Sequence, residues 1–204
     1  MDSAVNDCRS LTRRERLRNE TRPAHMRLDA LVTGQDYFSS VDRYGTWLQH
    51  SYDFHEQLEK TLESAGAAGL FADWDARRKT GLIQQDRADL GLEPRNCTTK
   101  SDLALADHAE CLGALYVMEG ASMGARVLLI AARRLGLTGQ HGARHLSAAA
   151  SSMHAWRSFV AILEAARCTP ADEDRMIDAA RRTFDLATAC FAGAGSLNGS
   201  TVEA

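Results

Sequence analysis

The longest helical pattern in the chain runs from Ser101 to Leu135 and is interrupted only by glycines. Gly113, Gly120 and Gly124 recur at helical spacing, so at roughly 100° per residue they share one narrow stripe. Each interior glycine costs a helix about 1 kcal/mol relative to alanine. A helix that keeps all three glycines on one stripe must therefore gain something else from the missing side chains.

Helical signals also dominate the rest of the chain. It has three prolines, and no long window alternates apolar and polar residues with the period of two that is typical of strands. Thr12 and Glu15 have the spacing of a capping box and predict a helix start. Thr169-Pro170, followed by Asp172, predicts the start of the last helix. Further helices are expected over about 36–64, 72–90 and 147–167, with a glycine-rich loop at 136–144.

The chain is long enough for one domain with one hydrophobic core. Of its 204 residues, 45% are hydrophobic and 25% are charged, which is ordinary for a globular protein. We therefore expect an all-α, single-domain multi-helix bundle over residues 11–192. Residues 1–10 are expected to form a flexible N-terminus, and residues 193–204 a flexible C-terminal tail.

Charge and cysteine content limit the partners and the compartment. The net charge of −3 is too small to predict a nucleic-acid partner. No secretory signal is visible, and no apolar run reaches the length of a membrane span. The five cysteines are an odd number without a CxxC pair, which predicts free thiols in a reducing compartment. The expectation is a cytoplasmic protein with no membrane partner.

One histidine has neighbours that favour ligand binding. On a helix, His25 shares a face with Arg18 and Arg22, and Asp29 lies one turn further on. A metal-bound imidazole usually donates its other N–H to an acceptor such as this carboxylate. Two arginines can bind anionic groups of the same ligand. The alternative is a half-buried histidine beside a solvated arginine face, and spacing alone leaves both interpretations open.

The glycine stripe also has two interpretations. Without side chains, the backbone can lie directly on a flat group, or it can pack closely against another helix. Combined with a histidine face, the stripe makes a flat ligand between two helices plausible, and haem is planar, takes an axial histidine and carries two propionates. The sequence contains no Glu-x-x-His pair, G-x-S-x-G turn or P-loop that would indicate other chemistry.

Three segments resemble bacterial haem oxygenases, and most closely the subgroup associated with bacteriophytochromes. They read LRNETRPAHMRLDALV, YVMEGASMGARVL and CTPADEDRMIDAARRTFDLATACF, and the resemblance spans residues 11–192. It implies that His25 is the proximal iron ligand. It also implies that Arg18 and Arg22 lie near the haem propionates.

The same resemblance assigns roles on the second helix. Gly120 and Gly124 would let the distal helix lie across the haem face and would thereby direct the reaction. Tyr116 would contact a propionate or line the pocket, and a packing role is equally open. Glu119 belongs to the motif, and its role could be structural.

The implied activity is haem degradation. Haem would be both cofactor and substrate, and O₂ with external electrons would convert it to biliverdin, carbon monoxide and ferrous iron. No flavin or nicotinamide motif is visible, so a ferredoxin or a reductase would supply the electrons. A bacteriophytochrome would receive the biliverdin.

The chain departs from the family pattern in several places, among them Ala125, where members often have a second glycine. Many members place a polar side chain after the first distal glycine, where this chain has Ala121. This favours an alternative function, a haem-binding carrier or sensor with weak or no turnover. A second alternative is a haem-free enzyme of the same architecture, such as the thiaminase-like group, although the histidine and arginine face argues against it. Pro23 predicts a kink in the first helix, or a restart with Thr21 as N-cap.

Overall fold

The computed structural model describes residues 11–93, 97 and 102–192, and within them the chain is helical and contains no strand. The expected flexible ends, 1–10 and 193–204, lie outside the described residues. The elements are α1 (Arg13–Gly34), α2 (Val41–Ser64), η1 (Ala67–Gly69), α3 (Trp74–Arg77), α4 (Thr80–Asp89), α5 (His108–Ala121), η2 (Ser122–Gly124), α6 (Ala125–Arg134), α7 (Arg144–Ser151), α8 (Met153–Ala165) and α9 (Pro170–Ala192). The all-α prediction is confirmed.

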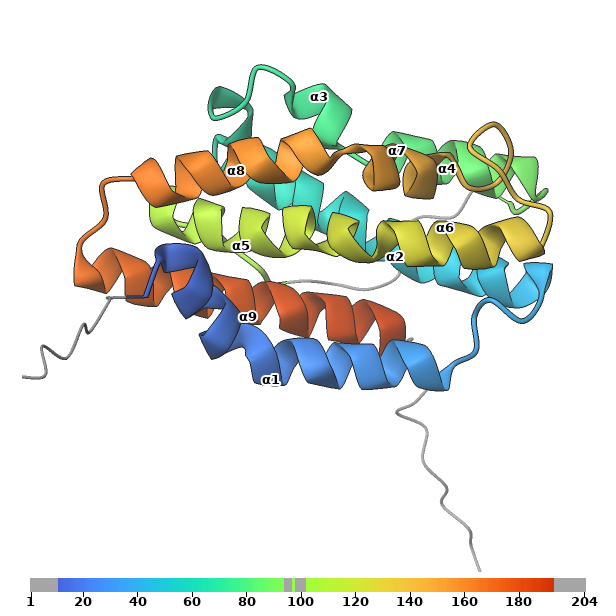
Figure 1. The fold of residues 1–204 in the computed structure, drawn as a ribbon, viewed down its shortest axis with the longest axis horizontal. Coiled ribbons are helices and arrows are strands. Elements are labelled where there is room, and N and C mark those ends of the chain that lie inside the picture. The colour runs from blue at the N-terminus through green and yellow to red at the C-terminus, as the bar shows by residue number, and fades with distance from the viewer. Residues whose placement is uncertain (1–10, 94–96, 98–101, 193–204) are drawn as a thin grey trace, which may run out of the picture.

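Helix α5 lies at the centre of the bundle (Figure 1). It packs against α9 on one side and α8 on the other, and α1 lies outside against α9 and α8. Helices α2, α4 and α7 pack together and form a second part of the core. Because α5 has neighbours on several sides, most of its residues are buried, as expected for a helix that is apolar all round.

Both predicted helix starts are confirmed. The hydroxyl of Thr12 accepts a hydrogen bond from the backbone N–H of Glu15, and the Glu15 carboxylate accepts one from the N–H of Thr12. At α9, the hydroxyl of Thr169 accepts from the N–H of Asp172, whose carboxylate accepts from the N–H of Thr169. These reciprocal bonds satisfy donors that helix starts otherwise leave unpaired.

Other boundaries differ from the prediction. Helix α2 begins at Val41 rather than near residue 36, because Asp36 has a positive φ of 50° and Ser40 supplies the N-cap. The segment 72–90 is divided into α3 and α4 by the extended backbone of Arg78. Ser152 separates α7 from α8, where one helix was predicted. Each break follows from backbone conformations that hydrophobic periodicity does not reveal.

The central segment, defined as α5, η2 and α6, begins later than predicted. Its first helix starts at His108, where Asp107 caps it by accepting from the N–H of Glu110. By length and composition, His108–Arg134 is long and apolar enough to cross a membrane, with a mean hydropathy of 1.4. This corrects the expectation that no apolar run is long enough. The burial of α5 inside the bundle accounts for much of that apolar content.

Candidate functional site

His25 lies on the exposed face of α1, with 59% of its side chain accessible. Its Nδ1 atom is 2.9 Å from Oδ2 of Asp29, one helical turn further on. Its ring meets the ring of Phe184 edge-on, with the centroids 5.7 Å apart. The carboxylate contact occupies Nδ1 and leaves Nε2 as the nitrogen for a metal.

Two arginines on the same helix have no acidic partner among the described residues. Arg18 and Arg22 are exposed, and neither forms an ion pair with an acidic residue in the described part of the chain. By contrast, Arg13 and Arg16 on the same helix both form ion pairs with Glu173 of α9. The guanidinium groups of Arg18 and Arg22 are therefore available to an anionic ligand.

Tyr116 connects the central segment to α1. Its side chain is half-buried, and burial raises the pKa of its phenol, while hydrogen bonding with Thr21 and the charges of Arg18 and Arg14 lower it. The phenol therefore faces the part of α1 that carries these cations. Arg14, which the sequence pattern did not single out, acts on the pKa of this phenol in the same direction as Arg18.

The three glycines of the stripe have different surroundings. A Cβ added to Gly113 would lie 2.0 Å from the carbonyl oxygen of Met176, so this glycine serves close packing of α5 on α9. A Cβ on Gly120 would have only an atom of Trp156 nearby, at 3.9 Å, and one on Gly124 would meet nothing within 4 Å. The helix-packing interpretation therefore holds for Gly113, whereas Gly120 lies beside Trp156 of α8 and Gly124 faces open space.

The predicted break at the glycines is present. The α-helix changes to a 3-10 turn at η2, where the hydroxyl of Ser122 donates to the carbonyl of Glu119 at 2.5 Å. In α1, the helix continues through Pro23 and bends in its first half (Figure 1). Thr21 does not restart it, because its hydroxyl donates back to the carbonyl of Leu17.

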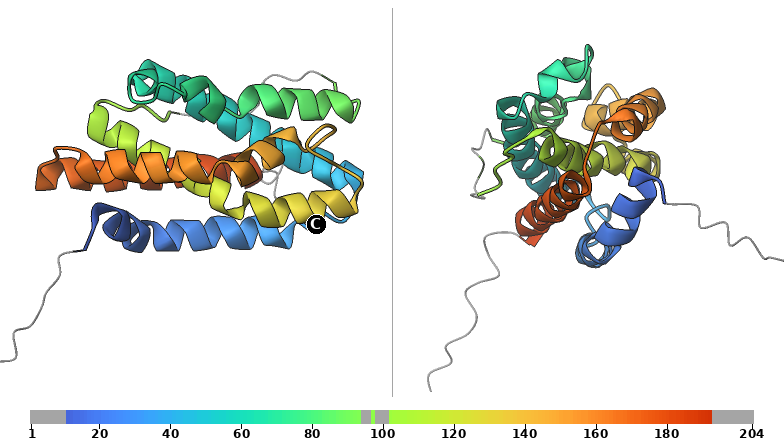
Figure 2. Two further views of the ribbon diagram at one scale, coloured as in Figure 1. Left: turned by 45° about the horizontal axis from the view of Figure 1, so that its top comes forward. Right: turned by 90° about the vertical axis from the view of Figure 1, so that its left-hand side faces the viewer.

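The surfaces that carry these residues are neighbours. Tyr116 of α5 interacts with Thr21 and Arg18 of α1, and α1 runs below α6 in the left view of Figure 2. His25 on one side and Gly124 on the other are both exposed. A planar group needs a ligand atom on one face and a surface free of side chains on the other, so the residues present fit haem. Among the described residues, no group of three or more His, Cys, Asp or Glu side chains could hold a bare metal ion.

Glu119 of the motif has a structural role. It is 5% exposed, and its carboxylate lies 2.7 Å from Nη1 of Arg77. That guanidinium also donates to Ser158 and to Asp73 and lies over the ring of Phe71. The ion pair therefore ties the central segment to α3 and α8. Glu119 and Arg77 are far apart in sequence, so no local pattern could have revealed the pair.

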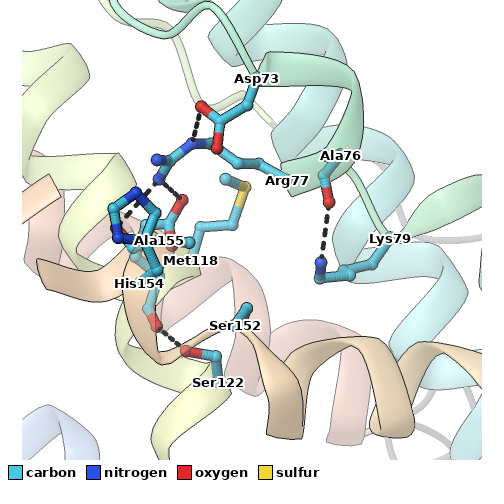
Figure 3. Close-up of a pocket in the computed structure, with 10 residues that line it drawn as sticks. Asp73, Ala76, Arg77, Lys79, Met118, Ser122, Ser152, His154 and Ala155 are labelled. Carbon is cyan, nitrogen blue, oxygen red and sulfur yellow. Dashed lines mark hydrogen bonds and ion pairs between the residues drawn. The ribbon is translucent and has the colours of Figure 1, made fainter. Parts of the chain in front are cut away.

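A cavity of about 200 Å³ lies on the side of the central segment that faces α3 and α8 (Figure 3). Its walls include Lys79, Glu119, Ser122 and His154. Burial lowers the pKa of Lys79, whose ammonium donates to the carbonyl of Ala76. None of the predicted site residues lines this cavity, so it is separate from the predicted site.

His145, which lies outside the predicted site, is buried in a polar cluster. Nδ1 of His145 lies 2.5 Å from the Asp86 carboxylate, which also accepts from the backbone N–H groups of Arg144 and His145. Burial lowers the pKa of this histidine, and the carboxylate opposes that change. The cluster holds the start of α7 against α4.

Three comparisons place this arrangement among known proteins. The family model described as Heme oxygenase matches residues 12–193. Heme oxygenase PigA of Pseudomonas aeruginosa is 33% identical over 198 residues, which cover 93% of this chain and 98% of that protein. The crystal structure of the NO- and CO-bound heme oxygenase from Neisseria meningitidis aligns with a TM-score of 0.76 and 28% identity, covering 95% of this chain and 99% of that one.

The fold and the family match thus define a helical haem-degrading enzyme. The chain belongs to the haem oxygenase family. Haem is the substrate of this family, and the match argues against the haem-free alternative.

Proposed function

We propose that this chain binds haem between α1 and the central segment, with Nε2 of His25 as the axial ligand. The observation that carries the assignment is the pairing of Nδ1 with Asp29, 2.9 Å away, on an exposed face of α1, in a chain whose central segment is open at Gly124. The carboxylate holds the imidazole proton on Nδ1 and so directs the Nε2 lone pair outward. Bound haem supplies the iron that activates O₂ and the porphyrin carbon that is oxidised.

The other predicted residues position the ligand. Arg18 and Arg22 attract the two propionates, and the Tyr116 hydroxyl donates to one of them. Gly120 and Gly124 let the backbone of the central segment approach the opposite face and fix which edge reacts. Because Ala121 offers no polar group, the proton comes from water held by backbone carbonyls and other polar groups around η2.

The products are biliverdin, carbon monoxide and ferrous iron. O₂ is the oxidant, and a ferredoxin or reductase supplies the electrons, since the sequence has no flavin or nicotinamide motif. The sequence resemblance to the bacteriophytochrome-associated subgroup supports a cytoplasmic enzyme whose biliverdin passes to a bacteriophytochrome.

The test is aerobic turnover of the haem complex with chromatographic identification of the bilin isomer. One haem should bind per chain, and adding ascorbate should convert it to a single main biliverdin isomer. If haem binds through His25 and ascorbate under oxygen yields no biliverdin, the carrier or sensor function that Ala121 favours replaces this proposal.

A further inference from the structure

The acidic residues are distributed very unevenly along the chain. Residues 120–163 contain five arginines but no Asp or Glu. The rest of the sequence therefore contains 19 basic and 27 acidic residues. Of the five, Arg144 pairs with Asp86 and Asp89. A protein with a net charge of −3 thus carries a locally basic region over α6, α7 and the first half of α8.

The exposed side of α6 combines this charge with apolar surface. Met123, just before the helix, and Val127 and Ile130 within it are 60%, 70% and 50% exposed. Arg126, Arg133 and Arg134 flank them, all exposed and none ion-paired with an acidic residue in the part of the chain described. We name these six residues the α6 face.

This composition fits a protein partner of opposite charge. An apolar centre with arginines at the rim is typical of protein–protein interfaces, in which complementary charges speed association. The α6 face also begins next to Gly124, the glycine assigned to the haem surface, and α6 runs along the outside of the bundle (Figure 2). A partner docked there would therefore lie beside the haem.

We propose that the α6 face docks an acidic electron-transfer protein, such as a reduced ferredoxin or flavodoxin. The inference rests on the proposed function, which requires an external electron donor. In each encounter the donor's cofactor loses one electron, and the ferric haem iron gains it and becomes ferrous. No group of this chain changes its oxidation state.

The experiment compares two reductants on the same haem complexes. Arg133 and Arg134 form the end of the α6 face farther from Gly124, so the variant is Arg133→Glu/Arg134→Glu. With a reduced acidic ferredoxin, the rate of haem reduction should fall about tenfold, because the charge reversal removes electrostatic steering. With ascorbate, which needs no docking surface, the rate should not change. Raising the salt concentration should slow the ferredoxin reaction of the wild type and leave that of the variant almost unaffected.

Two further variants serve as controls. Lys60→Glu/Arg167→Glu changes the net charge equally on exposed residues of α2 and the α8–α9 connection, and should leave the ferredoxin rate near that of the wild type. Arg133→Gln/Arg134→Gln should give an intermediate rate. Thermal melts of all variants should agree within a few degrees, because the substituted side chains are exposed.

Several results would overturn the docking inference. An unchanged ferredoxin rate, or an equal loss in the Lys60/Arg167 control, would remove the α6 face from donor binding. Arginine-dependent binding to vesicles that contain anionic lipid would assign the face to a membrane instead. If the wild type with ascorbate fails to make biliverdin while its haem is still reduced through the α6 face, the proposed function fails and the docking inference stands.

Discussion

Nδ1 of His25 and Oδ2 of Asp29 lie 2.9 Å apart, one turn apart on the same exposed helix face. A carboxylate in this position fixes the tautomer and the orientation of a metal-bound imidazole. The two side chains are 59% and 64% exposed, and the ring of His25 also meets the ring of the core residue Phe184, so α1 and α9 together set its orientation.

The first prediction concerns the axial ligand. His25→Ala should abolish the histidine-ligated haem spectrum, and added imidazole should restore it by occupying the vacated position. His108→Ala, at the exposed start of α5, is the matched control and should keep the wild-type spectrum. An unaltered spectrum in His25→Ala would show that another group binds the iron.

The second prediction separates the roles of the glycines. Gly124→Leu should lower haem affinity at least tenfold while the melting temperature is maintained, because its Cβ has no protein atom within 4 Å and the side chain would enter the haem surface. Gly113→Ala should instead destabilise the fold by about 1–3 kcal/mol or more, because its Cβ would clash with the carbonyl of Met176. Thermal melts and haem titrations of both variants measure the contrast. An equal loss of stability in both variants would show that the glycine stripe serves only helix packing.

The third prediction concerns Arg18 and Arg22. Exposed ion pairs contribute only about 0–1 kcal/mol each, so these arginines should affect the orientation of haem more than its affinity. Arg18→Glu/Arg22→Glu would place carboxylates beside the propionates, and the repulsion should turn the ring in its plane. Chromatography should then show a changed ratio of biliverdin isomers. An unchanged ratio with unchanged affinity would exclude both residues from the site.

Much of the fold could be predicted because its signals are local. The bonds of Thr12 with Glu15 and of Thr169 with Asp172 join residues three apart, and both helix starts were predicted from that spacing. The pairing of His25 with Asp29 is equally local. Errors occurred where the backbone alone decides, as at Asp36 with its positive φ.

The parts of the site that could not be predicted depend on long-range contacts. Periodicity placed Gly113 and Gly124 on one stripe. Only the three-dimensional structure shows that Gly113 packs against α9 and that Gly124 faces open space. The Arg77–Glu119 pair and the Asp86–His145 cluster each join helices distant in sequence. Nothing in the neighbouring residues marks any of these side chains as buried.

The fourth prediction concerns the buried ion pair. Glu119→Gln should cost about 1–3 kcal/mol of stability, because the buried guanidinium of Arg77 would lose one of its two carboxylate partners and keep Asp73. Haem affinity per folded molecule should not change if Glu119 acts only as an anchor. Urea unfolding measures the first quantity and haem titration the second. A normal stability combined with lost turnover would instead give Glu119 a part in the reaction.

The fifth prediction is a pH dependence of stability that originates at Glu59. This carboxylate on α2 is 1% exposed and accepts from the backbone N–H groups of Lys79 and Thr80, at 2.6 and 3.2 Å, where α4 begins without a side-chain cap. Burial alone would raise its pKa, but interactions with His55, Lys79 and Thr80 outweigh burial and lower it to about 2.

A pKa that is lower in the folded state stabilises the fold at pH values above the unfolded pKa. For Glu59 this stabilisation, on the order of 3 kcal/mol, should be complete above about pH 4.5 and be lost as the pH falls from there towards 2. Glu59→Gln should therefore be less stable than the wild type at pH 7, and the difference should shrink in acid. Glu63→Gln, at a partly exposed carboxylate on the same helix, should differ from the wild type by less than about 1 kcal/mol throughout. Urea unfolding between pH 3 and pH 7 gives both curves, and a Glu59→Gln difference that is constant with pH would show that the folded protein does not depress this pKa.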